Sequence, residues 1–145
     1  MIRALRTLIP ALALLPLAVG CGEDDTNDNA APTVVAGEAL CSSVQGEVIL
    51  TYVSFTVEDA DGVMDLGDPV MLVEASRLTP ELEPVEDAER PENPLRARFV
   101  WEQGTNGASE RIYCGEAGTD LTVSFEIRDM AGFPTQEATL QTQLD

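Results

Sequence analysis

The stretch Leu121-Thr-Val-Ser-Phe-Glu-Ile-Arg128 decides the fold class that this chain is expected to adopt. Apolar and polar side chains alternate along it without a break. A period of two is typical of a β-strand that packs one face on a core and turns the other to solvent. The same alternation is found at 53–57 and 95–102. Three such segments favour antiparallel sheets.

Shorter apolar segments extend this pattern. We expect further strands at 70–75, 110–114 and 137–143, and a bulge near Thr51, where the run 48–57 changes face. Turn dipeptides such as Asp-Gly and Asn-Gly separate the segments, and no segment has a convincing helical period. The sequence therefore predicts an all-β fold, a single antiparallel β-sandwich of about seven strands.

Two stretches resemble repeats of known families. The run Val53-Ser-Phe-Thr-Val-Glu-Asp-Ala-Asp-Gly62 resembles the strand and aspartate-rich turn of bacterial immunoglobulin-like and cadherin-like repeats. The stretch from Leu121 to Gly132, with Ala138 to Thr142, resembles their final hairpin. The resemblance implies an immunoglobulin-like sandwich across 34–145.

Charge and composition exclude several classes of function. The 145 residues include 26 Asp and Glu and 8 arginines, with no lysine and no histidine, and the formal charge is −18. Such a surface repels phosphates, so no nucleic-acid partner is expected. Histidine-activated nucleophiles, imidazole metal ligands and catalytic lysines are missing. A pair of carboxylates, as in glycoside hydrolases, is the remaining catalytic option, and a small sandwich leaves little room for its cleft. We expect the chain not to be an enzyme.

The N-terminal residues have the pattern of a secretory leader. Arg3 and Arg6 precede an uncharged, leucine-rich stretch at 7–20, which is shorter than the ~20 residues of a membrane-spanning helix. The stretch ends in Leu17-Ala-Val-Gly-Cys21, which resembles the lipobox of bacterial lipoproteins. In that family the cysteine sulfur receives a diacylglycerol, the leader is then cut off directly before the cysteine, and the new amino group is acylated. The resemblance implies a signal peptide at 1–20 and a membrane anchor of several acyl chains on Cys21.

The remaining cysteines form an even pair. If Cys21 carries lipid, Cys41 and Cys114 are left in an exported, oxidising compartment, where we expect a disulfide between them. In antibody domains a tryptophan follows the first cysteine closely, whereas Trp101 lies far downstream of Cys41. Antibody-type topology is therefore not expected.

The acidic stretch at 21–33 connects the predicted anchor to the domain at 34–145. It reads CGEDDTNDNAAPT, with no apolar period, and is predicted to be a flexible tether. In enteric lipoproteins an aspartate directly after the lipidated cysteine favours the inner membrane. Here that position is Gly22, so the resemblance implies the outer membrane.

An aspartate-rich turn contains the candidate metal ligands. Asp59 and Asp61, with Asp65 and Asp68 downstream, are calcium candidates because carboxylates two residues apart can converge on one ion. The alternative, which we favour, is a turn for which Asp and Gly supply the backbone angles. No metal site is therefore assigned.

The segment 79–95 is rich in proline and acid. It is either a solvated crossover between sheets, the favoured interpretation, or an extended arm that presents Leu82 and Val85 to a partner. The arginines on outward faces are expected to pair with carboxylates; they are Arg96, Arg98, Arg111 and Arg128. The aromatic residues Phe99, Trp101 and Phe125 are expected to lie in the core.

Together these features predict a lipid-anchored protein of the cell envelope. Its domain would be a non-catalytic binding or structural module that needs no cofactor. Its partners would be the membrane, through the anchor, and an envelope protein or a polysaccharide. A calcium-dependent adhesion module and a carboxylate-based hydrolase are the alternatives, and the ligand and oligomeric state are open.

Overall fold

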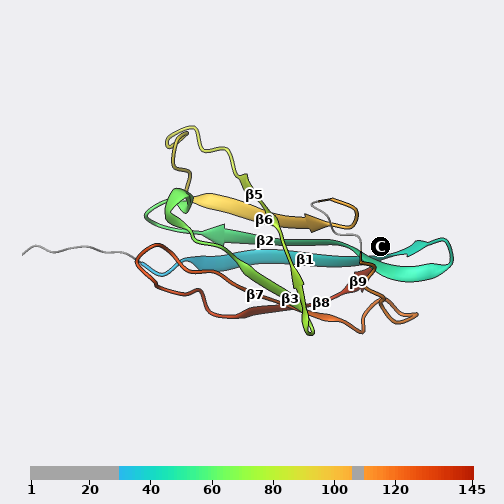
Figure 1. The fold of residues 1–145 in the computed structure, drawn as a ribbon. Coiled ribbons are helices and arrows are strands. Elements are labelled where there is room, and N and C mark those ends of the chain that lie inside the picture. Colours follow the sequence, from blue (N-terminus) through green and yellow to red (C-terminus); the bar gives the residue numbers. More distant parts are fainter. Residues whose placement is uncertain (1–29, 106–109) are drawn as a thin grey trace, which may run out of the picture.

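The computed structural model describes residues 30–105 and 110–145. The predicted leader, Cys21 and most of the predicted tether lie outside the described residues. No helix within the described ranges is long and apolar enough to cross a membrane. The elements (Figure 1) are β1 (Thr33–Val44), β2 (Glu47–Glu58), the 3₁₀ turn η1 (Val63–Asp65), β3 (Val70–Val73), β4 (Ser76–Leu78), β5 (Glu81–Pro84), β6 (Arg96–Glu102), β7 (Thr122–Glu126), β8 (Ala138–Gln141) and β9 (Gln143–Leu144).

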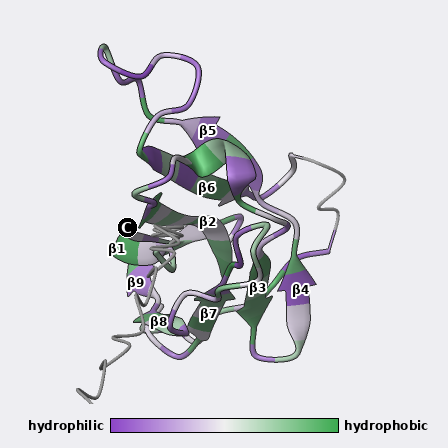
Figure 2. Cartoon of the chain, turned by 90° about the vertical axis from the view of Figure 1, so that its left-hand side faces the viewer, coloured by the Kyte–Doolittle hydropathy of each residue, from purple (hydrophilic) through white to green (hydrophobic). Residues whose placement is uncertain are grey.

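The strands form two facing sheets (Figure 2). One sheet contains β5, β6, β2, β1 and β9 in that order, and the other contains β4, β3, β7 and β8. The pairs are antiparallel, except for the short parallel pairing of β1 with β9. The chain is therefore an all-β sandwich, as the alternating segments predicted.

The strand order corrects the expectation about topology. Immunoglobulin constant domains place their first, second, fifth and fourth strands in one sheet and their third, sixth and seventh in the other. Here β1, β2, β6 and β5 lie together opposite β3, β7 and β8, with β4 and β9 as additional strands. The antibody pattern of cysteines and tryptophan is absent, as expected, because Trp101 lies on β6 and the disulfide begins on β1.

The predicted bulge near Thr51 is confirmed. Leu40 on β1 pairs with Tyr52, whereas the next residue, Cys41, pairs with Leu50, so Thr51 is an additional residue in β2. Its hydroxyl donates to the Leu40 carbonyl at 3.3 Å. The additional residue reverses the alternation of β2, which lets both halves of this long strand contribute side chains to the core.

The core lies between the sheets and consists of the inward residues of the alternating segments. The Phe55 ring on β2 stacks on the Phe125 ring on β7 with centroids 4.7 Å apart, and Phe99 packs on the same ring at 5.4 Å. Trp101 is 3% exposed, so the aromatic residues are core, as expected. Aliphatic residues that are equally buried include Leu50, Val53, Val57, Met71, Val73, Val123 and Ile127.

The segment 110–114, a predicted strand, makes only an isolated bridge from Tyr113 to β2. The expected disulfide is present at the end of this segment and joins Cys114 to Cys41, with Cα atoms 6.5 Å apart. A turn at 115–118 follows at once and prevents the pairing from extending.

The proline-rich segment 79–95 is only in part a crossover. Its residues Glu81–Pro84 form β5, which pairs with β6 at the edge of the larger sheet. The Val85 N–H donates to the Arg96 carbonyl at 3.1 Å, and the alternation of an antiparallel ladder then directs Pro84 toward the open edge. Because proline has no N–H, this edge is a poor template for a further strand.

Candidate functional site

The loops at the end of the sandwich where β1 begins carry the candidate residues. Asp59 directly follows β2, and Asp61 lies on the same turn. The Asp59 Oδ1 accepts the Asp61 N–H at 2.9 Å, and the Asp59 carbonyl accepts the Gly62 N–H at 3.2 Å. One carboxylate oxygen of Asp59 therefore stabilises the turn itself.

The loop before β6 holds this turn in place through Asn93. The Asn93 Nδ2 donates to the Asp61 carbonyl at 2.9 Å, and its Oδ1 accepts the Met64 N–H at 3.0 Å. Gly62 has a φ of 102°, and a Cβ there would lie 2.1 Å from the Asn93 amide nitrogen. Only glycine fits both the angle and the space. The turn and the loop are thus fastened to each other.

Two further aspartates lie behind the turn. Asp65 belongs to η1, and its carbonyl accepts the Met130 N–H at 2.8 Å. Asp129 follows β7, and its Oδ1 accepts the Phe133 N–H at 2.8 Å. An isolated bridge between Leu66 and Asp129 joins the two segments. Asp59 and Asp129 are 2% and 4% exposed, so this end of the core is bounded by carboxylates.

The environment of these carboxylates disfavours their charged form. Burial raises the pKa of Asp59 above its ordinary value of 3.8, and the charges of Asp65, Asp61 and Asp129 add to this, against the Asp61 N–H, which lowers the pKa. Burial also raises the pKa of Asp65, and Asp129 and Asp61 act in the same direction. The Asp59 Oδ2 and Asp65 Oδ1 are buried without a hydrogen-bond partner. Negative charge is therefore concentrated where water solvates it poorly.

The calcium candidates Asp59 and Asp61 lie in different surroundings, since the first is buried and the second is exposed. Across 30–105 and 110–145, no group of three or more Asp, Glu, Cys or His side chains is arranged to hold a metal ion. Asp68 is also exposed. Calcium binding at these residues stays the alternative to the favoured interpretation of a turn.

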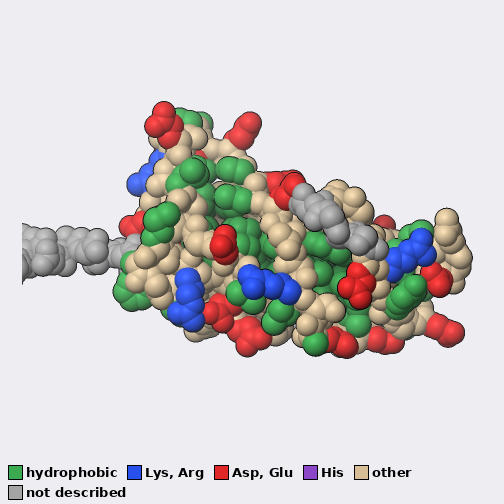
Figure 3. Space-filling model, in the orientation of Figure 1, with side chains coloured by type: hydrophobic (Ala, Val, Ile, Leu, Met, Phe, Trp, Pro, Cys, Tyr) green, Lys and Arg blue, Asp and Glu red, His purple; other side chains and the backbone are tan. Residues whose placement is uncertain are grey.

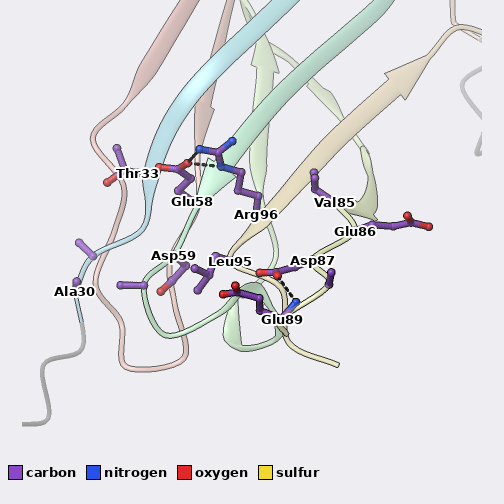
Figure 4. A pocket seen from close by; sticks show the side chains of 13 residues that line it. Ala30, Thr33, Glu58, Asp59, Val85, Glu86, Asp87, Glu89, Leu95 and Arg96 are labelled. Carbon is purple, nitrogen blue, oxygen red and sulfur yellow. Dashed lines mark hydrogen bonds and ion pairs between the residues drawn. The ribbon is translucent and has the colours of Figure 1, made fainter. Parts of the chain in front are cut away.

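A groove of about 740 Å³ lies beside the turn (Figure 4). One wall is the chain that enters β1, and the other is the loop that follows β5. Asp59 and Leu95 lie between these walls. The lining residues are Ala30, Ala31, Thr33, Glu58, Asp59, Ala60, Val85, Glu86, Asp87, Ala88, Glu89, Leu95 and Arg96. A smaller pocket of about 480 Å³ lies between the start of β1 and the segment 134–138.

The charges that line the groove are mostly negative. Arg96 is the only cation among the lining residues, and it forms an ion pair with Glu58. The Asp87 Oδ1 accepts the N–H groups of Glu89 and Arg90 at 2.9 and 3.2 Å, which shapes the loop. The acids that remain give the groove a net negative charge.

Comparison with known proteins finds no family model, no curated protein and no solved structure that matches the chain.

The outward arginines pair with carboxylates, as expected. The Arg98–Glu83 pair has an N–O distance of 2.7 Å, and a side-chain hydrogen bond to Glu83 raises the pKa of Arg98. Arg96, Arg111 and Arg128 pair with Glu58, Glu47 and Glu126. Figure 3 shows acidic side chains spread over one face, with arginines between them. Each of these four guanidinium groups therefore has a carboxylate partner.

The groove and the role of Asp129 were not predicted from the sequence. Asp129 stands in an Arg-Asp-Met-Ala-Gly run after a strand, which is the same strand-then-aspartate pattern as at Asp59. In an immunoglobulin-like sandwich those two strands finish at the same end of the sandwich, so the repeated pattern could have predicted that Asp129 lies near Asp59. The groove had no such signal, because its walls come from segments far apart in the sequence.

Proposed function

We propose that this chain is a lipid-anchored protein of the cell envelope, whose sandwich is a non-catalytic binding or structural module. The observation that carries this proposal is the run Leu17-Ala-Val-Gly-Cys21 after a cationic, apolar leader. Gly22, in place of aspartate, favours the outer membrane as the destination. The partner would be an envelope protein or a polysaccharide.

The position at which the chain enters the fold supports this arrangement. β1 begins at Thr33, so the eleven residues 22–32 separate it from Cys21. A flexible coil of that length spans roughly 20 Å. The loops with the aspartates and the groove belong to the end of the sandwich where β1 begins, and this end would lie nearest the anchor.

The non-catalytic part of the proposal rests on the available chemistry. The chain has no histidine and no lysine, which leaves carboxylates as general acids and bases. In the groove, Glu58 is paired with Arg96 and Asp87 accepts backbone N–H groups. A glycoside hydrolase needs two carboxylates free to face one sugar, and two of the acids that line the groove are already engaged.

Calcium binding is a second candidate function, for which the buried oxygens without partners are the specific observation. A cation that Asp59 Oδ2 and Asp65 Oδ1 both coordinated would give each of these oxygens a partner. If so, millimolar calcium should raise the melting temperature of the wild type and not that of Asp65→Asn. An unchanged wild-type midpoint in calcium would dismiss this candidate.

Expression of the full chain in a Gram-negative host tests the anchor. We expect mass spectrometry to find diacylglycerol on Cys21 and the protein in the outer-membrane fraction. The Cys21→Ser variant should lack the lipid and keep its leader, because in that family the leader is cut only after the cysteine sulfur is acylated. Asp24→Asn, a nearby change outside the motif, should behave as the wild type. A wild-type chain with a free thiol at Cys21 would contradict the proposal.

A further inference from the structure

The loop between β7 and β8 carries exposed apolar side chains. Met130 and Phe133 are 78% and 47% exposed, and Met130 is the most exposed large apolar side chain in the described part of the chain. Met64, in η1, is 57% exposed. The Met130 N–H donates to the Asp65 carbonyl at 2.8 Å, so η1 and this loop are neighbours. We call the side chains of Met64, Met130 and Phe133 the apolar tip.

The loop that presents Met130 and Phe133 is held in a fixed shape. The Asp129 Oδ1 accepts the Phe133 N–H at 2.8 Å, and the Asp129 N–H donates to the Phe133 carbonyl at 3.1 Å. The Thr135 hydroxyl accepts the Ile127 N–H at 3.1 Å. These bonds use neither the Met130 nor the Phe133 side chain. A surface that is fixed in this way loses little conformational entropy when it is covered.

The same loop is free of exposed charge. Residues 130–134 are all exposed and none of them is charged, although the chain as a whole has a formal charge of −18. The carboxylate at the start of the loop, Asp129, is 4% exposed. Exposed apolar surface is typical of sites that contact a protein or a membrane. This loop can enter an apolar phase without taking an ion out of water.

The apolar tip belongs to the end of the sandwich that the chain enters. Residues 31–34 and residues of the segment 134–138 line the smaller pocket, so the chain enters beside the loop that carries Met130 and Phe133. Thr33 pairs with Glu58 at the end of β2, and η1 follows β2. Figure 1 shows the loops at 59–69 and 128–137 at this end.

The predicted anchor places this end nearest the membrane. A coil of the eleven residues 22–32 spans roughly 20 Å. β1 alone has 12 residues and is therefore about 40 Å long, so the opposite end of the sandwich is much farther from the anchor. A short tether also keeps the concentration of the apolar tip at the membrane on the order of millimolar, so a weak contact is sufficient.

Acidic side chains around the apolar tip determine which membrane surface it can approach. Asp61 and Asp68 are exposed on the two sides of η1, and Glu86 and Glu89 are exposed in the loop after β5. These carboxylates are repelled by anionic headgroups. A zwitterionic phospholipid surface has no net charge, so it does not repel them.

We propose that the apolar tip docks on the zwitterionic phospholipid surface to which the chain is anchored. Met130 and Phe133 would lie at the boundary between headgroups and acyl chains. The inference rests on the proposed function as a lipid-anchored protein and names a second contact with the same membrane. The long strands β1 and β2 would then extend away from the bilayer.

Quenching of tryptophan fluorescence by lipid tests the docking. The lipidated full-length protein is reconstituted in phosphatidylcholine vesicles with and without brominated acyl chains. We expect Phe133→Trp to lose about half of the fluorescence that its additional tryptophan supplies, because that side chain lies at the level of the acyl chains. The wild type supplies the background, since its Trp101 is 3% exposed and lies in the core.

The matched control is Tyr113→Trp. Tyr113 is an aromatic residue that is 57% exposed, and it bridges to Ile49 near the opposite end of the sandwich. This variant should show no quenching beyond the wild-type background. Met130→Trp is a second probe at a more exposed position, and it keeps the test valid if far-UV circular dichroism shows that Phe133→Trp fails to fold.

Vesicles that contain phosphatidylglycerol test the choice of lipid surface. We expect this anionic lipid to reduce the quenching of Phe133→Trp, and added salt to restore it, because salt screens the repulsion between the acidic loops and the headgroups. Quenching that becomes stronger with phosphatidylglycerol at low salt would contradict docking on a zwitterionic surface.

Two further results would overturn the inference. Absence of quenching for both Phe133→Trp and Met130→Trp in folded, lipidated protein would exclude the membrane as the occupant and leave a partner protein. Equal quenching of Tyr113→Trp and the two tip variants would show that the domain has no preferred end toward the bilayer.

The anchor and the apolar tip are tested separately. Mass spectrometry measures the lipid on Cys21. If this residue has a free thiol, coupling the thiol to a maleimide phospholipid supplies an anchor at the same position for the quenching measurement. Quenching without native lipid would reject the proposed anchor and keep the docking, whereas lipidated protein without quenching would do the reverse.

Discussion

Asp59 shows how one residue can hold a local structure and destabilise it at the same time. Its Oδ1 accepts the N–H of Asp61 and closes the turn, whereas its Oδ2 is buried without a partner. Because the folded pKa of Asp59 is raised above 3.8, the folded state holds this proton more tightly than the unfolded state does. The protonated Asp59 carboxyl therefore contributes favourably to the free energy of unfolding below pH 3.8, and this contribution is lost as pH rises through the folded pKa.

The variant Asp59→Asn should be more stable than the wild type at pH 7. Asparagine keeps the oxygen that accepts the Asp61 N–H and removes the buried charge, for a gain of about 1 kcal/mol. The gain should shrink at pH 3.5, where the wild-type carboxyl is protonated. Urea unfolding at the two pH values measures both effects.

The matched control is Asp61→Asn, an exposed neighbour in the same turn, for which we expect a change within about 0.5 kcal/mol. A fall in the stability of Asp59→Asn at pH 7 would show that the Asp59 charge is compensated and would contradict this account.

At the scale of elements, the two sheets are joined by aromatic stacking. Phe55 belongs to the larger sheet and Phe125 to the smaller one, and their rings are nearly parallel, with an angle of 15° between planes. Phe99, from β6, packs on the same ring at 46°. A single side chain on β7 thus contacts two strands of the opposite sheet.

Replacement of this side chain should be costly. We expect Phe125→Ala to lower the free energy of unfolding by about 3–5 kcal/mol, because it removes a fully buried ring and leaves a cavity between the sheets. Ser124→Ala, on the other face of the same strand, should change it by less than about 0.5 kcal/mol. Chemical denaturation followed by Trp101 fluorescence measures both, and a loss below about 1 kcal/mol for Phe125→Ala would argue against the stacked core.

At the scale of the whole molecule, the disulfide connects the first strand to the last third of the chain. Cys41 lies on β1 and Cys114 lies before β7, with a sequence separation of 73. The Asp145 N–H also donates to the Cys41 carbonyl at 3.0 Å, which brings the C-terminal end to the same place. Closure of so long a loop restricts the unfolded chain strongly.

Removal of this cross-link should lower stability throughout the domain. The double variant Cys41→Ser/Cys114→Ser is expected to lose about 4 kcal/mol of unfolding free energy in guanidinium titrations. Reducing agent should produce a similar loss in the wild type and no further loss in the variant. A reductant effect of equal size in both proteins would show that the disulfide is not its cause.

Local patterns in the sequence accounted for the faces of the strands and for the bulge. Alternation placed Val53, Phe55 and Val57 in the core, and a reversal of that alternation located Thr51 as the additional residue. Such patterns failed at 110–114, where the short apolar run from Ile112 to Cys114 suggested a strand but the chain turns away after a single bridge. They also missed β5 among the prolines of 79–95, because edge pairing with β6 overrides a weak strand propensity.

The sequence by itself determined that this protein folds as antiparallel sheets around an apolar core, because the side-chain period of a strand is a local property. The predicted leader and the cysteine count likewise come from the sequence alone. Only the tertiary structure decided that β6 lies beside β2 and β7 beside β3, and that 30–33, 58–60, 85–89 and 95–96 meet around one groove. Those neighbours are selected by packing between segments distant along the chain, which no local period encodes.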